Sequence, residues 1–264
     1  MAADSPVIAP PVRRRAPVMG TVASIHVHDD APSDLVHAAI DDALTELERL
    51  EAMFSTYRAD SVVSAINRGE RNVLDGPAEV IDVLDACTWL EQITGGAFRA
   101  RRPEPPFPID PAGFVKGWAT ERASAALERA GLRRWCFSVG GDLIARGRSR
   151  SGQPWRIAVA DPSHRGQVLA SIPLSDAAVA TSGTSERGHH VWDGRRSNPA
   201  TDLASLTVIG PHLTWADAFA TAAFALGAEG LSWVEQLERY EAMSVDSEGR
   251  LATTTGLVLS EPAP

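Results

Sequence analysis

Hydrophobic residues recur at strand or helix spacing along the first half of the chain. The stretch TVASIHV (21–27) alternates as a strand does, and 33–54 places apolar residues at helical spacing behind Ser33 as an N-cap. Further helices are predicted over about 77–93 and 113–130. The residues between them, 95–109, are rich in Gly and Pro, which indicates a loop.

The second half begins with a different pattern. From 135 to 210, short β-rich runs such as WCFSVG, WRIAVA and SLTVIG are separated by turn residues, which is typical of an antiparallel sheet. An Ala-rich helix follows over 214–227, another reaches about 239, and 251–259 is predicted as a last strand. Clustered helices and clustered strands favour an α+β fold with a mixed or antiparallel sheet and packed helices.

The composition and net charge of the chain argue against several classes of protein. The hydrophobic share of 44% is that of a globular protein. The formal charge of -9 and the pI near 5.3 argue against a surface for nucleic acid or an anionic membrane, but they leave room for a local basic pocket that binds a phosphate ligand. Cys87 and Cys136 have no metal-like spacing, so both are interpreted as small buried apolar side chains. No apolar run approaches the ~20 residues of a membrane-spanning helix.

The start of the chain is Pro-rich, and we expect a loose arm over 1–16 followed by one domain over 17–264. Arg13, Arg14 and Arg15 could begin an export signal, but Gly, Ser and His interrupt the apolar residues after them. With no convincing signal peptide and no lipoprotein cysteine, we expect a cytoplasmic protein.

The segment DPAGFVKGWA (110–119) contains the only lysine of the chain, Lys116, among 25 lysines and arginines. It lies near a predicted helix start, where free N–H groups and nearby glycines favour an anionic ligand such as a phosphate. A surface lysine at a helix start is the alternative. The pair Gly140–Gly141, between two strand-like runs, is equally well explained by a hairpin turn.

Ionisable residues are dense in TSGTSERGHHVWDGRR (181–196). On a strand, His189 and His190 would face opposite ways, so at most one of them faces a site. In the Ala-rich helix, Asp217 and Thr221 share one face, and two oxygen donors there suit Mg²⁺. Thr214 and Asp217 also match a capping box, which would explain the acid without a metal.

These segments occur in the order of one known family. The matching pieces are Met19-Gly20-Thr21, FSTYRADSVVSAINRG, TGGAF, DPAGFVKGWA, VGGDL, WRIAVADP, AVATSGTSERG with His190, and ADAFATAAFALG. On these motifs the chain resembles the ApbE family of FAD:protein FMN transferases over nearly its whole length.

The resemblance implies an ApbE-like fold and an enzyme that uses Mg²⁺ to pass the FMN moiety of FAD to a threonine hydroxyl of an acceptor protein, releasing AMP. It implies that Asp217, Thr221 and the carbonyl of Val115 hold the metal. It makes His190 the base that deprotonates the threonine, and Asp217 and His190 the catalytic pair. It places the FAD site in segments that contain Met19, Tyr57, Ala97, Phe98, Asp110, Lys116, Glu121, Gly140, Gly141, Asp142, Thr181, Ser182 and Gly183.

Two segments depart from the family pattern. Asp193 is followed by GRRS instead of Pro-x-Thr-Gly, and Arg99 replaces the acid of GGAFD. Arg99, Arg101 or Arg102 could instead meet a phosphate or the acceptor. The departures keep open a flavin-binding protein without catalysis. A second alternative is an FAD pyrophosphatase, which would use the same site but let water replace the threonine and release FMN and AMP.

Overall fold

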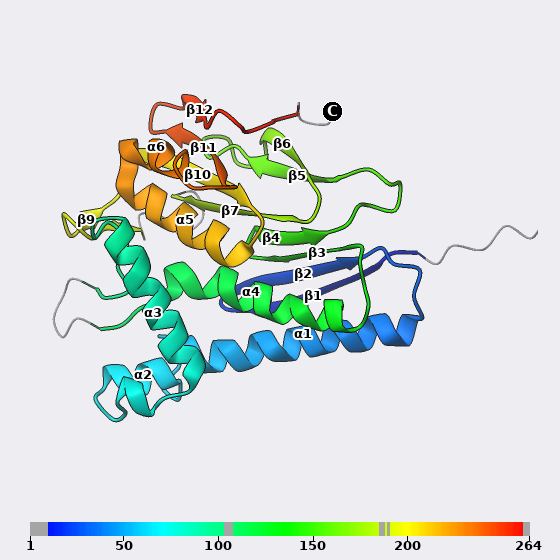
Figure 1. Ribbon diagram of the computed structural model, residues 1–264, viewed down its shortest axis with the longest axis horizontal. Coiled ribbons are helices and arrows are strands. Elements are labelled where there is room, and N and C mark those ends of the chain that lie inside the picture. The colour runs from blue at the N-terminus through cyan, green and yellow to red at the C-terminus, as the bar shows by residue number, and fades with distance from the viewer. Residues whose placement is uncertain (1–9, 103–107, 185–187, 189–190, 261–264) are drawn as a thin grey trace, which may run out of the picture.

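A large antiparallel sheet forms the centre of the computed structural model, which describes residues 10–102, 108–184, 188 and 191–260 (Figure 1). Neighbouring strands are paired antiparallel throughout this sheet. Its eight strands lie in the order β1 (Val12–Val18), β2 (Thr21–Val27), β3 (Trp135–Val139), β4 (Asp142–Arg146), β7 (Ala177–Gly183), β10 (Leu203–Gly210), β11 (Glu241–Asp246) and β12 (Leu251–Thr253).

Helices cover one face of this sheet, with α1, α4 and α5 running across it (Figure 1). Two short 3-10 helices, Val73–Asp75 and Gly227–Glu229, join them. The α-helices are α1 (Ser33–Phe54), α2 (Val62–Asn67), α3 (Ala78–Ile93), α4 (Ala112–Arg129), α5 (Leu213–Leu226) and α6 (Gly230–Val234).

The other face of the sheet carries a two-stranded ladder of β5 (Trp155–Ala160) and β6 (Val168–Leu174). Because side chains alternate along a strand, Ile144 of β4 points into the helical core, while Leu143 and Ala145 pack with the ladder. A second short hairpin is formed by β8 (Trp192–Asp193) and β9 (Asn198–Pro199). The structure thus confirms the α+β class.

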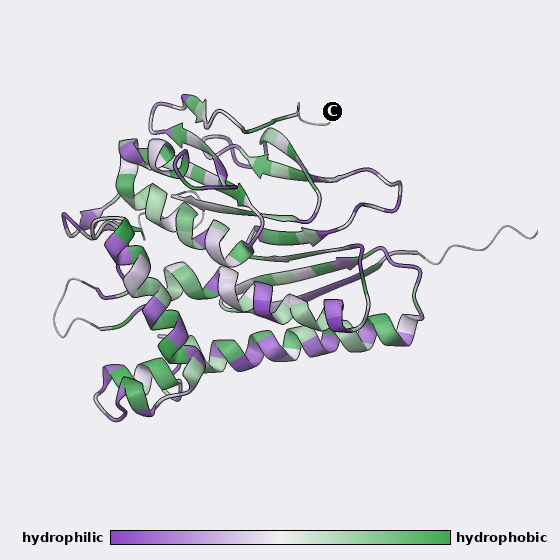
Figure 2. Ribbon diagram, viewed as in Figure 1, coloured by the Kyte–Doolittle hydropathy of each residue, from purple (hydrophilic) through white to green (hydrophobic). Residues whose placement is uncertain are grey.

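Figure 2 shows that α1 has a mixed hydropathy pattern, whereas α5 is almost entirely apolar. Most residues of α5 are buried, and Asp217 is the one charged residue in its sequence. A carboxylate inside such a helix is costly unless it has partners, so Asp217 is the residue of α5 that most needs a functional or structural reason.

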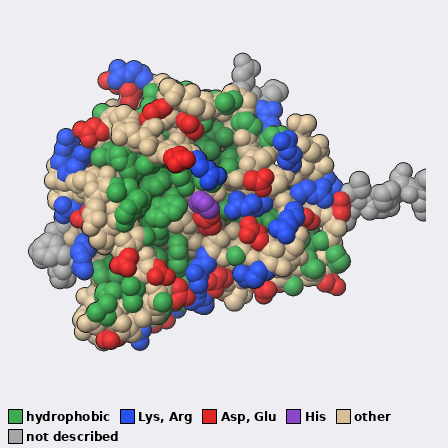
Figure 3. Space-filling view, in the orientation of Figure 1, with side chains coloured by type: hydrophobic (Ala, Val, Ile, Leu, Met, Phe, Trp, Pro, Cys, Tyr) green, Lys and Arg blue, Asp and Glu red, His purple; other side chains and the backbone are tan. Residues whose placement is uncertain are grey.

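Six aromatic side chains around α5 form a continuous packed cluster, namely Trp89, Phe114, Trp215, Phe219, Trp233 and Tyr240. Trp215 contacts Trp89 and stacks on Phe219, which in turn contacts Tyr240 edge-on. Trp89 is 44% exposed, and Figure 3 shows hydrophobic side chains gathered on this face of the molecule, over α3 and α5. This cluster anchors α5 against α3 and therefore fixes one side of the helix that carries Asp217.

Several sequence-based boundaries need correction. The arm expected over 1–16 is wrong for residues 12–16, which belong to β1 and pair with β2 through the backbone. Little in the sequence indicated this strand, because most of its side chains are exposed and three of them are arginines. Ser33 is not an N-cap, since Pro32 holds that position without a side-chain bond. The helix expected to reach 239 ends at Val234, and the next strand, β11, was not predicted.

Other expectations hold in part. The helices predicted over 33–54, 77–93 and 113–130 are confirmed within one residue. The last strand is shorter than the predicted 251–259, since only Leu251–Thr253 pairs with β11. Within the described ranges, none of the helices combines the length and hydrophobicity that crossing a bilayer requires.

The core can be tested on α1, which offers a matched pair of leucines. Leu47 is fully buried, whereas Leu35 on the same helix is 40% exposed. Leu47→Ala should lower the free energy of unfolding by about 2–5 kcal/mol because it leaves a cavity. Leu35→Ala should change it by less than about 1 kcal/mol. Chemical denaturation measures both, and equal losses would contradict this placement of α1.

Candidate active site

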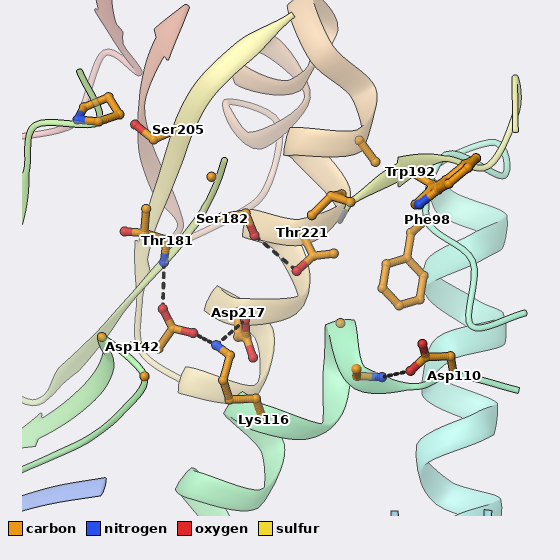
Figure 4. Close-up of a pocket in the computed structure, with 18 of the residues that line it drawn as sticks. Phe98, Asp110, Lys116, Asp142, Thr181, Ser182, Trp192, Ser205, Asp217 and Thr221 are labelled. Carbon is orange, nitrogen blue, oxygen red and sulfur yellow. Dashed lines mark hydrogen bonds and ion pairs between the residues drawn. The ribbon is translucent and has the colours of Figure 1, made fainter. Parts of the chain in front are cut away.

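A cavity of about 790 Å³ opens between α4, α5, β4, β5, β7 and the β8–β9 hairpin. Its size suits a ligand of several rings. Twelve of the residues expected in the FAD or metal site line it, and Figure 4 shows how the labelled side chains among them lie. They are Tyr57, Phe98, Asp110, Lys116, Gly140, Gly141, Asp142, Thr181, Ser182, Gly183, Asp217 and Thr221.

The other residues expected in the FAD or metal site do not line the cavity. Val115 is buried within α4, Ala97 is fully buried, and Met19 occupies the turn between β1 and β2 with a φ of 51°. Glu121 points to the first turn of α5 and does not line the cavity. His190 lies outside the described residues.

Asp217 and Thr221 lie on the cavity side of α5, as their spacing predicted. The Oδ2 atom of Asp217 accepts a hydrogen bond of 2.7 Å from the backbone N–H of Gly117. The hydroxyl of Thr221 shares a hydrogen bond of 3.2 Å with that of Ser182 on β7. Both side chains are thus held at the cavity wall by neighbouring elements, Asp217 through Oδ2 and Thr221 through its one hydroxyl.

The capping-box interpretation of Asp217 is wrong. Thr214 lies inside α5, and both its backbone N–H and its hydroxyl donate to Glu121 Oε2, at 2.9 and 2.6 Å. Glu121 also contacts His212 Nδ1 at 2.9 Å. A carboxylate from α4 therefore satisfies the start of α5, which accounts for Glu121 and leaves Asp217 free of any capping role.

The helices α4 and α5 touch at two glycines, which lie under the two candidate ligands. A Cβ at Gly117 would stand 2.6 Å from the Cβ of Asp217, and one at Gly113 would stand 3.0 Å from Thr221 Cγ2. Gly113 and Gly117 are separated by four residues, as are Asp217 and Thr221, so one helical face fits the other. At Gly117 only glycine allows this approach, since a Cβ there would also stand 2.6 Å from the backbone oxygen of Leu213.

Lys116 reaches between two buried carboxylates (Figure 4). Its ammonium is 3.0 Å from Asp217 Oδ1 and forms an ion pair with Asp142 Oδ2. The side chains of Asp142 and Asp217 are only 3% and 5% exposed. The second oxygen of Asp142 accepts a hydrogen bond of 2.9 Å from the N–H of Thr181. The lone lysine is therefore part of the site and not a surface residue.

Gly140 and Gly141 form the two-residue turn between β3 and β4, with φ values of 58° and 95°. The hairpin explanation is correct, and the turn also lines the cavity. Asp142 directly follows the turn as the first residue of β4, so the glycines place its carboxylate at the cavity.

An aromatic wall closes another side of the cavity. Phe98 and Trp192 lie near one another there (Figure 4). Tyr57 contributes a third ring to the lining, and it is 94% exposed. Trp192 was not identified from the sequence. The only sign of it in the sequence was a large apolar residue within the ionisable segment 181–196.

The two segments that depart from the family pattern touch each other. A Cβ at Gly194 would lie 2.7 Å from both Cγ and Cδ of Arg99 and would clash with the carbonyl oxygen of Gly96. The N–H of Gly194 donates to the carbonyl of Ala97 at 2.9 Å. Arg99 Nε lies 3.5 Å from a carboxylate oxygen of Glu91. Glycine at 194 thus makes room for the arginine at 99.

Asp193 fixes the β8–β9 hairpin from inside. It is 5% exposed and accepts two side-chain hydrogen bonds of 2.9 Å from Arg195. Burial alone would raise the pKa of Asp193, but the bonds from Arg195 outweigh it and hold this pKa below its ordinary value of 3.8. Within the altered GRRS segment, Arg195 is therefore held by hydrogen bonds to the buried carboxylate of Asp193.

The glycine contact gives a direct test. Gly117→Ala should lower the free energy of unfolding by about 1–3 kcal/mol, because overpacking against α5 exceeds the ~1 kcal/mol gained in helix propensity. Gly113→Ala should cost less, since its nearest neighbours are side-chain atoms that can move. Denaturation curves compare the two, and a Gly117→Ala protein as stable as the parent would contradict this packing.

The hairpin should depend on pH in a defined direction. A carboxyl with a lowered folded-state pKa stabilises the fold above its unfolded pKa, and this stabilisation is lost as the pH falls through the folded value. Arg195→Ala should therefore destabilise the protein by about 1–2 kcal/mol at pH 6 and by progressively less as the pH falls through the folded-state pKa of Asp193, which lies below 3.8. Arg71→Ala, which removes an exposed arginine outside the hairpin, is the control. A pH-independent loss in Arg195→Ala would count against the pairing.

Known proteins resemble the chain in sequence and in fold. Among sequences, an FAD:protein FMN transferase of Treponema pallidum is 25% identical over 91% of this chain and 86% of its own length. That of Salmonella typhimurium is 30% identical over 66% of this chain and 53% of its own length.

Among solved structures, the ApbE protein of Thermotoga maritima has a TM-score of 0.80 at 24% identity, covering 93% of this chain and 97% of its own. The flavin transferase ApbE of Vibrio cholerae has a TM-score of 0.77 at 21% identity, covering 95% and 97%. The sequence profile of the ApbE family matches residues 19–101 and 99–244. With its fold and most of its sequence matched in this way, the chain belongs to the ApbE family.

Proposed function

We propose that this protein is an Mg²⁺-dependent transferase that moves the FMN moiety of FAD to a threonine hydroxyl of an acceptor protein and releases AMP. The relatives from Treponema pallidum and Salmonella typhimurium carry the name FAD:protein FMN transferase. The observation that carries the proposal is the placement of Asp217 and Thr221 on the cavity side of an otherwise uncharged helix.

The donor set fits Mg²⁺. Carboxylate and hydroxyl oxygens are hard ligands, and Mg²⁺ usually takes one or two carboxylates together with phosphate oxygens and waters. Among the described residues, no group of three or more His, Cys, Asp and Glu side chains could hold a metal ion. Asp217 and Thr221 are therefore proposed as the side-chain ligands, with FAD supplying phosphate oxygens. The third proposed ligand, the carbonyl of Val115, has less support because Val115 does not line the cavity.

The cavity has two chemically different parts that suit a dinucleotide. The rings of Phe98 and Trp192 offer faces for stacking, while the carboxylate pair and Lys116 gather charge at another part of the wall. We propose that the flavin or adenine lies along the aromatic wall and that the pyrophosphate lies near Lys116. The Mg²⁺ would supply positive charge beside the pyrophosphate.

The proposed reaction exchanges the phosphoanhydride bond between the two halves of FAD for a phosphate ester on the acceptor threonine. The threonine oxygen forms a bond to the FMN phosphorus, the P–O bond to the AMP phosphate breaks, and AMP leaves with the bridging oxygen. The hydroxyl proton passes to a base, for which we propose His190 on the basis of the family resemblance. Lys116, Thr181 and Ser182 remain as cavity groups that position the phosphates.

Incubation with FAD, Mg²⁺ and a candidate acceptor protein tests the proposal. Mass spectrometry should find FMN attached to an acceptor threonine, and Asp217→Ala and Thr221→Ala should lower the rate at least about 100-fold. Asp82→Ala, which removes an exposed carboxylate from α3, should leave the rate unchanged.

Release of AMP should require the acceptor. If AMP and free FMN accumulate without one, and no acceptor becomes labelled, the protein is a pyrophosphatase. If wild-type protein binds FAD but neither transfers nor cleaves it, the non-catalytic alternative replaces the proposal.

A further inference from the structure

We infer that Lys116 is an internal counter-ion that occupies the cation position of the site, so that a divalent metal enters together with the dinucleotide and not alone. This inference rests on the proposed function and concerns the order in which its components bind. It starts from the contacts of the chain's single lysine.

The two buried carboxylates are bound in the same way. One oxygen of each carboxylate accepts a hydrogen bond from a backbone N–H. Asp217 accepts from Gly117 at 2.7 Å, and Asp142 accepts from Thr181 at 2.9 Å. Each gives its other oxygen to the ammonium of Lys116. The oxygen of Asp142 that faces Lys116 has no hydrogen-bond partner among the described residues beyond this ion pair.

Both oxygens of Asp217 are therefore engaged in this arrangement. A metal ion that binds Asp217 Oδ1 must take the place of the ammonium, because two cations cannot share that oxygen at bonding distance without strong repulsion. The exchange costs the ion pair and places a positive charge next to the released lysine. A metal ion that enters without an anionic ligand is therefore opposed by the positive charge of Lys116.

A diphosphate changes this balance. Its negative oxygens can accept the ammonium of Lys116 as it leaves Asp217, and they also complete the metal's oxygen shell. Lys116 is suited to such a move, since its compact charge sits on a flexible stem and its side chain is 23% exposed. Asp142 remains within reach, so the lysine can turn toward the ligand while it keeps one carboxylate partner.

The geometry also explains why glycine follows the lysine. The N–H of Gly117 holds Asp217 Oδ2, and a side chain at 117 would push α5 away. The sequence Lys-Gly thus binds one carboxylate from two adjacent positions, by a fixed backbone donor and by a movable side chain. Only the second of these donors can be exchanged for a metal.

Titration with Mn²⁺ alone, followed by electron paramagnetic resonance, tests this role without FAD or acceptor. Lys116→Gln should bind Mn²⁺ at least about tenfold more tightly than wild type, because the competing charge is gone. Lys116→Arg keeps the charge and should stay within about threefold of wild type. Arg99→Gln removes a cavity-lining charge that is paired with Glu91, and it should also leave Mn²⁺ affinity unchanged.

Equal Mn²⁺ affinities for wild type and Lys116→Gln would overturn the inference, as would a tighter site in Lys116→Arg. Because the titration contains no flavin and no acceptor, its outcome is independent of whether transfer occurs. Absence of flavin transfer with a tighter Lys116→Gln site would contradict the proposed function alone.

A second measurement uses the wild-type protein, so it does not depend on whether a variant folds. Lysine labelled with ¹⁵N at Nζ gives one signal, because Lys116 is the only lysine. Mg²⁺ alone should leave this signal in place, whereas Mg²⁺ with ADP should shift it. A shift of the same size at the same Mg²⁺ concentration without ADP would show that the metal displaces the lysine unaided and would overturn the inference.

Discussion

The close approach of α4 and α5 is the constraint on which the site depends. Two glycines of α4 lie directly under Asp217 and Thr221 of α5, and any larger side chain at Gly117 would meet atoms of both the backbone and Asp217. This contact lets a backbone N–H of α4 hold the carboxylate. The same turn of α4 carries Lys116, so one short segment sets both the spacing of the helices and the charge between them.

Charge balance follows from that packing. Asp142 and Asp217 are almost fully buried, and a single ammonium neutralises part of their charge from between them. Removing one partner from such a group is costly, because an unpaired buried charge remains. The arrangement therefore favours an exchange of cations over the loss of one. A site of this kind accepts a metal readily only when an anionic ligand enters with it.

Sequence patterns predicted local features well and contacts between distant segments poorly. The spacing of Asp217 and Thr221 placed them on one helix face, and the turn at Gly140 and Gly141 was recognised. The capping box failed because Glu121, from another helix, satisfies the start of α5. No local rule predicts that contact. The strand β1 escaped prediction because an exposed edge strand needs little hydrophobic alternation. The contact between Gly194 and Arg99 was equally invisible, since the two residues are unusual separately and explain each other only in the fold.

Asp217 and Thr221 are proposed to form the metal end of a dinucleotide site, and a crystal structure with FAD and Mn²⁺ is the sharpest test of that role. Anomalous scattering would locate the metal. We expect it to be bound to Asp217 Oδ1, Thr221 Oγ1 and the pyrophosphate, with Lys116 turned from Asp217 toward a phosphate oxygen. A metal bound elsewhere would refute this assignment, as would FAD bound with the Lys116–Asp217 ion pair intact and no metal beside it.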